Sequence, residues 1–82
     1  MIVSAQISVY PLRETRLSPV IEQALDTFKE RGLTVSPGAM SSLVSGDDEA
    51  LFAALKEAFQ RSSSGGDVVM VVTLSNACPV SR

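Results

Sequence analysis

The sequence predicts an α+β sandwich in which a four-stranded antiparallel sheet carries two helices on one face. Three observations support this prediction: segments of strand character at both ends of the chain, two segments with helical periodicity, and a short hairpin between them. The 82 residues leave room for one core, so we expect a single domain over residues 1–82.

The first strand is predicted over residues 2–10, because apolar and polar side chains alternate there and Pro11 follows. One face is apolar and the other polar. The apolar face holds Val3, Ala5, Ile7 and Val9, and the polar face holds Ser4, Gln6, Ser8 and Tyr10.

The first helix is predicted to begin at Ser18-Pro19 and to end at Gly32, since serine caps helices and glycine closes them. Lys29 and Arg31 suit the negative end of the helix dipole. Its apolar stripe consists of Leu17, Val20, Ile21, Ala24, Leu25 and Phe28.

A hairpin is predicted next, with short strands over residues 33–36 and 40–45 around Pro37-Gly38, the second ending at Gly46. Three acidic residues, 47–49, then open a second helix, and we interpret them as helix capping rather than a calcium loop. The side chains predicted to be buried on this helix are Leu51, Phe52, Leu55, Ala58 and Phe59.

After a loop over residues 62–66, residues 68–75 have the β-branched content of a last strand, which the tail from Asn76 to Pro79 breaks. Right-handed crossovers in the order β-α-β-β-α-β put both helices on one side of the sheet. This is the ferredoxin-like sandwich, in which the first and third strands are central and the second and fourth form the edges.

Composition excludes several classes of function. The net charge is −2 with no basic patch, so neither nucleic acid nor an anionic membrane is an expected partner. Without histidine and with one cysteine, no zinc site and no usual acid–base enzyme is expected. We therefore expect a cytoplasmic protein that is not an enzyme and has no metal or cofactor, with Cys78 as a structural or pocket-wall residue rather than a nucleophile.

The face of the sheet away from the helices, called the open face below, requires a cover. The last strand is apolar on both faces, with Val69 and Val71 on the face away from Val68, Met70, Val72 and Leu74, and the chain has no third helix. We therefore expect a second copy to bury the open face, giving a homodimer or homotetramer.

Neutral hydroxyl and amide side chains share this face, and once enclosed they suit a neutral heteroaromatic ligand with ring acceptors and an amino donor. The alternative is the solvated face of an ordinary antiparallel sheet. The predicted ligand-binding set is Ser4, Gln6, Ser8, Tyr10, Thr73, Ser75 and either Ser41 or Ser42.

Three segments resemble the YkoF family of thiamine- and hydroxymethylpyrimidine-binding proteins, in the same order and over nearly the whole chain. They are Ser4–Leu12, the Ser41–Gly46 strand with the acidic turn and Ala50-Leu51-Phe52 after it, and Thr73–Pro79. The resemblance implies a ferredoxin-like, YkoF-like domain that captures the thiamine pyrimidine without turnover. YkoF carries two such domains in tandem, so self-association would have to recreate the pair.

Two other functions fit the same pattern. One is a regulatory or structural association domain that assembles through its open sheet face. The other is a small enzyme of this architecture, such as a dimeric isomerase or an acylphosphatase. Such isomerases often rely on a histidine, which this chain lacks, and no Arg-and-Asn phosphate cradle is found.

Overall fold

Four strands and two helices follow one another in the predicted order in the computed structural model, which describes residues 1–12, 18–38 and 41–77. A single turn of 3-10 helix precedes the last strand. The elements are β1 (Ile2–Pro11), α1 (Ser18–Glu30), β2 (Thr34–Pro37), β3 (Ser42–Asp47), α2 (Asp48–Ser62), η1 (Ser63–Gly65) and β4 (Val68–Ser75).

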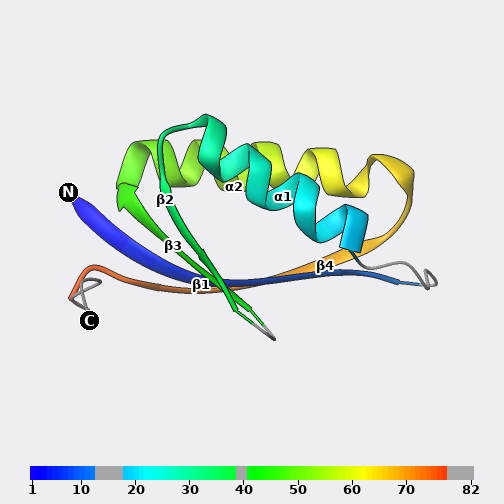
Figure 1. Ribbon diagram of the computed structural model, residues 1–82, viewed down its shortest axis with the longest axis horizontal. Coiled ribbons are helices and arrows are strands. Elements are labelled where there is room, and N and C mark those ends of the chain that lie inside the picture. Colours follow the sequence, from blue (N-terminus) through cyan, green and yellow to red (C-terminus); the bar gives the residue numbers. More distant parts are fainter. Residues whose placement is uncertain (13–17, 39–40, 78–82) are drawn as a thin grey trace.

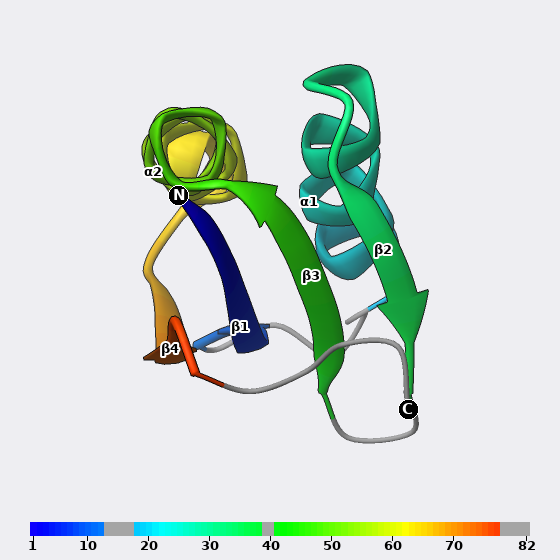
Figure 2. The same ribbon diagram turned by 90° about the vertical axis from the view of Figure 1, so that its left-hand side faces the viewer.

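The strands form one antiparallel sheet in the order β2-β3-β1-β4, so the first and third strands are central, as predicted. Both helices lie on one face of this sheet, α2 on the side of β4 and α1 on the side of β2 (Figures 1 and 2). The ferredoxin-like sandwich is therefore confirmed, and the face opposite the helices is left uncovered by the described elements.

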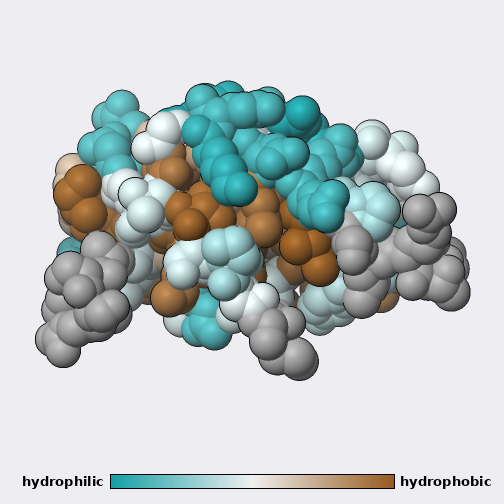
Figure 3. Space-filling view, viewed as in Figure 1, coloured by the Kyte–Doolittle hydropathy of each residue, from teal (hydrophilic) through white to brown (hydrophobic). Residues whose placement is uncertain are grey.

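The core lies between the sheet and the helices. Val3, Ala5 and Ile7 of β1 are buried, and they pack with Phe28 of α1 and Leu51 of α2, which have no exposed area. Hydrophilic residues cover the outer surface of the helices, and hydrophobic residues gather between helices and sheet (Figure 3). The alternation predicted for β1 is thus confirmed, because its apolar face is the one under the helices.

Helix α1 ends as its sequence predicts. Gly32 adopts a φ of +78°, and its N–H donates to the Lys29 carbonyl at 3.0 Å while the Leu33 N–H donates to the Phe28 carbonyl at 3.2 Å. These bonds satisfy carbonyls that a helix end otherwise leaves without partners. The helix begins at Ser18, whose side chain, like Leu17, lies outside the described residues.

The predicted stripe of α2 is partly wrong. Phe52 and Phe59 are 53% and 44% exposed, and the buried positions are Leu51, Ala54, Ala58 and Ser62. Small alanines allow α2 to pack closely against its neighbours, and this orientation turns both phenylalanines to a flank.

Several boundaries also differ from the sequence prediction. Strand β3 runs from Ser42 to Asp47, so Gly46 lies inside the strand opposite Val3 instead of after it. Asp47 is the N-cap of α2, with its Oδ2 accepting a hydrogen bond from the Glu49 N–H at 3.2 Å. The helix then continues to Ser62, and the predicted loop is partly the 3-10 turn Ser63–Gly65.

Candidate functional site

The predicted polar residues of β1 and β4 do share the open face. In the register of the sheet, Ser4 lies opposite Ser75 and Gln6 lies opposite Thr73. Cross-strand partners point to the same side of a sheet, and the residues between them in β1 are buried under the helices. Ser8 and Tyr10 continue the same face opposite Val71 and Val69.

Of the two neighbouring serines, Ser41 is the one that lies on the open face. Gln6 Nε2 donates a hydrogen bond of 2.9 Å to Ser41 Oγ, which places this hydroxyl beside the open face. Ser42 pairs with the buried Ile7 and is itself buried, so it is not the one of the two that lies on the open face. The turn between β2 and β3 decides which side chains of β3 face the helices, because it pairs Pro37 with Ser42. A shift of one residue in this pairing would move every side chain of β3 to the other face of the sheet.

A cavity of about 60 Å³ lies at the end of β3, where β1 continues past Ile7 with β4 as its described partner. Three hydroxyl-bearing residues, Ser8, Ser41 and Ser42, reach it from both sides of the sheet. Its other described lining residues are Ile7, Val9, Ile21 and Gly38. A smaller space of about 20 Å³ shares four of these residues and leads inward to Phe28. Ser42 therefore lines the cavity although it misses the open face.

The middle of the open face is exposed to solvent in a single copy. Gln6 and Thr73 are exposed there, and the apolar Leu43 and Val71 beside them are also at least half exposed. Ser4, Ser8 and Ser75 are half-buried. The face thus combines hydrogen-bonding groups with apolar side chains that water covers unless another surface does.

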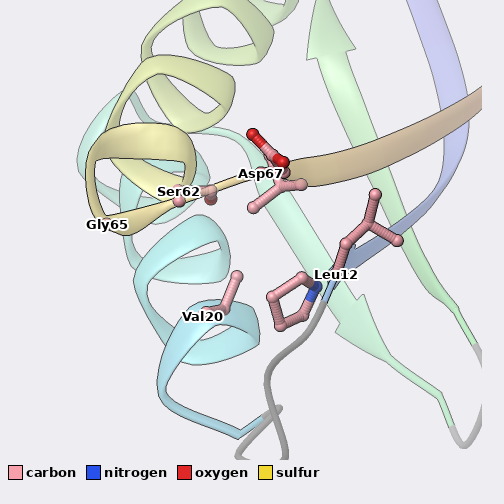
Figure 4. A pocket seen from close by; sticks show the side chains of 8 residues that line it. Leu12, Val20, Ser62, Gly65 and Asp67 are labelled. Atoms are coloured by element: carbon pink, nitrogen blue, oxygen red, sulfur yellow. The ribbon is translucent and has the colours of Figure 1, made fainter.

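A larger cavity of about 420 Å³ lies further along β1, between the start of α1 and the end of α2 (Figure 4). Sequence reasoning missed it because four separate segments build its walls. Ser62 Oγ is sealed inside the protein and has no hydrogen-bond partner among the residues that the structure describes, so it offers a ligand no accessible atom. The described lining residues are Pro11, Leu12, Val20, Ser62, Gly65, Gly66, Asp67 and Val68.

The described residues include neither a cluster of metal ligands nor a membrane-spanning helix. Across residues 1–12, 18–38 and 41–77, no three histidine, cysteine or acidic side chains gather as metal ligands. Neither helix in this part of the chain has the length and apolar character needed to span a membrane. Cys78, predicted to be structural or to line the pocket, lies outside the described residues.

Solved structures share this fold over most of the chain. A hypothetical protein of Methanocaldococcus jannascii is 28% identical, with a TM-score of 0.84 over 92% of this chain and 79% of its own. A protein of Streptococcus pneumoniae is 22% identical, with a TM-score of 0.86 over 99% of this chain and 92% of its own.

A candidate thiamine biosynthesis/salvage protein of Thermotoga maritima is 23% identical, with a TM-score of 0.81 over 92% of this chain and 83% of its own. No curated protein matches the chain. The model of the YkoF-related family matches residues 2–81, which is nearly the entire sequence. The chain therefore belongs to the YkoF-related family.

Proposed function

We propose that the protein is a non-catalytic binder of thiamine or of its hydroxymethylpyrimidine part, held at the open face beside the cavity of Ser8, Ser41 and Ser42. Membership of the YkoF-related family and the similarity to the Thermotoga protein support a thiamine-related ligand. The observation that carries the choice of site is the hydrogen bond from Gln6 to Ser41, which lines this cavity.

The chemistry of these groups matches an aminopyrimidine edge. With its amide nitrogen donating to Ser41, Gln6 keeps a carbonyl oxygen that can accept from an exocyclic amino group. A serine hydroxyl at the cavity can donate to a ring nitrogen. Uncharged donors and acceptors recognise a neutral ring without the desolvation cost of buried charges.

The size of the cavity requires a second wall. Its volume of about 60 Å³ is far below the 300–1,000 Å³ of usual ligand sites, so a thiamine molecule would extend over the open face. Exposed Leu43 and Val71 flank that path. We propose that another copy of the chain, in a homodimer or homotetramer, closes the site sheet against sheet.

We propose binding without turnover. The chain has no histidine to move protons near neutral pH. Binding for transport, salvage or regulation in the cytoplasm fits the site better than catalysis.

Thermal unfolding with and without millimolar thiamine or hydroxymethylpyrimidine tests this function. A ligand at 100 times its dissociation constant stabilises a protein by about 2.7 kcal/mol, which raises the melting temperature of so small a domain by about 10–20 °C. Gln6→Leu should abolish the increase, whereas Gln23→Leu on the exposed surface of α1 should preserve it.

Other outcomes separate the alternatives. No increase with either compound, in a protein that still self-associates, would favour the association domain, for which exposed Leu43 and Val71 also provide an apolar surface. An increase that survives Gln6→Leu but disappears in Val20→Phe would place the ligand in the larger cavity instead.

A further inference from the structure

The space at the end of β3 continues inward from the open face. The outer cavity of about 60 Å³ and the smaller space of about 20 Å³, which we call the inner pocket, share four lining residues, among them Ile21 and Ser42. Ala24, Leu25 and Phe28 of α1 line the inner pocket alone. The two spaces therefore adjoin, and together they run from the open face, past the end of β3, to the buried side of the sheet.

Apolar side chains form the wall of the inner pocket. Among its described lining residues, Ser42 alone carries a polar side chain, and Ala24 and Phe28 are buried. The volume of about 20 Å³ exceeds the roughly 10–15 Å³ that one water-sized group requires, but a buried water normally has about two to four polar partners. The inner pocket therefore has room for one small group and suits a methyl group better than a water molecule.

Hydroxyl-bearing residues line the outer cavity from two strands. Ser8 belongs to β1, whereas Ser41 and Ser42 lie at the beginning of β3, where its pairing with β1 ends. Serine hydroxyls can donate hydrogen bonds to the nitrogens of an aromatic ring. A ring carbon that carries a methyl group between two ring nitrogens presents the matching arrangement, because an apolar group is then flanked by two acceptors.

We propose that the inner pocket binds a single methyl group of the ligand, and that the site thereby selects a pyrimidine methylated at the carbon between its two ring nitrogens. This inference rests on the proposed function, because thiamine and its hydroxymethylpyrimidine part carry such a methyl group. The polar edge of the ring then stays at the hydroxyl groups of the outer cavity, and the methyl group points towards Phe28.

Ala24 is the residue that sets the size of the inner pocket. It lines the inner pocket but not the outer cavity, and its side chain is a single methyl group that is 2% exposed. A larger side chain at this position would fill the space, and glycine would enlarge it. Phe28 also belongs to the hydrophobic core, so its replacement would disturb the whole fold, whereas a small change at Ala24 acts mainly on the pocket.

Calorimetric titration of the full chain with three compounds tests the proposal. The compounds are 4-amino-5-hydroxymethylpyrimidines that bear hydrogen, methyl or ethyl at C2. The methyl compound should bind at least about tenfold more tightly than the hydrogen compound, since one carbon in an apolar pocket changes affinity by about 10–200-fold. The ethyl compound should also bind at least about tenfold more weakly than the methyl compound, because its second carbon has no room in a pocket of about 20 Å³.

Two substitutions of Ala24 should change this preference in different ways. Ala24→Val fills the inner pocket and should lower the affinity for the methyl compound to that for the hydrogen compound. Ala24→Gly enlarges the pocket and should remove the preference for methyl over ethyl, which keeps the test decisive if Ala24→Val folds poorly. Ala54→Gly is the matched control, because Ala54 is also buried in a helix but is not among the described lining residues of either space. It should retain the preference of the wild type, and thermal melting checks the fold of each variant.

The outcomes distinguish this inference from the proposed function. Nuclear Overhauser contacts between the C2 methyl protons and the ring protons of Phe28 in the complex would support the inference, and their absence from a saturated complex would overturn it. Equal affinity for all three compounds, or a folded Ala24→Gly protein with the preference of the wild type, would also overturn it while leaving the proposed function intact. If none of the three compounds binds, the proposed function and this inference are both refuted.

Discussion

Replacing Gly46 with alanine tests how tightly β3 is packed beneath the helices. An added Cβ would collide with Leu33 Cδ2, and the backbone at Gly46 has a φ of +157°, which L-residues rarely adopt. Leu33 is buried, so its side chain has little space into which to move. We expect Gly46→Ala to fold with clearly reduced stability.

The expected loss has two parts. Moving Leu33 within a packed core costs about 1–3 kcal/mol, and holding a non-glycine residue at this φ costs about 1–2 kcal/mol. Together they lower the free energy of unfolding by about 2–5 kcal/mol. For a domain of 82 residues this corresponds to a fall in melting temperature of about 10–40 °C.

Two other glycines separate the packing cost from the backbone cost. Stability is measured for all variants by urea denaturation followed by circular dichroism. Gly32 has a φ of +78° and open space around it, so Gly32→Ala should show the backbone cost alone. Gly65 has neither constraint, and Gly65→Ala should change stability by less than about 0.5 kcal/mol. In a Leu33→Ala background the effect of Gly46→Ala should fall by at least about 1 kcal/mol. A Gly46→Ala protein as stable as wild type would refute this account of the packing.

Three further predictions concern the core and the N-terminal end of α2, beside which Met1 lies. Phe28→Ala, at a fully buried position, should reduce the free energy of unfolding by about 3–5 kcal/mol in urea denaturation. Asp47→Ala removes the cap on the Glu49 N–H and should cost about 1 kcal/mol, while Asp47→Asn retains most of the stability in the same assay. The pKa of the Met1 amino group is raised because Asp48, and to a smaller extent Asp47, accepts its hydrogen bonds and attracts its charge. Its stabilising contribution should therefore be present below the ordinary pKa of about 8 and disappear as pH rises through the raised value. Asp48→Asn should reduce this loss in melts from neutral pH to about pH 10, because only the smaller contribution of Asp47 remains.

Much of the fold was predictable because local patterns and tertiary packing agree. The alternation in β1 and the helix stop at Gly32 each match the structure. Phe52 and Phe59 are the informative error. Their spacing suits a buried stripe, but Ala54 and Ala58 let α2 approach the sheet with another face, and periodicity does not reveal which of two apolar stripes is buried.

The sequence predicted which kinds of side chain form the candidate site better than it predicted where each of them lies. Strand parity placed Gln6 and Thr73 on one face, because period two holds along any regular strand. It could not decide between Ser41 and Ser42, since that choice depends on how the preceding turn sets the register of β3. No pattern in the sequence predicts the larger cavity, because its lining residues are distant from one another along the chain.

The order of strands and helices, the polar row on β1 and the charge-free last strand follow from the sequence by itself, because each depends on residues that are neighbours along the chain. Tertiary structure alone decided the rotation of α2, the cavity that joins Ser8 to Ser41 and Ser42, and the exposure beside β4. These features depend on distances between separate elements, and close packing of the whole domain sets those distances.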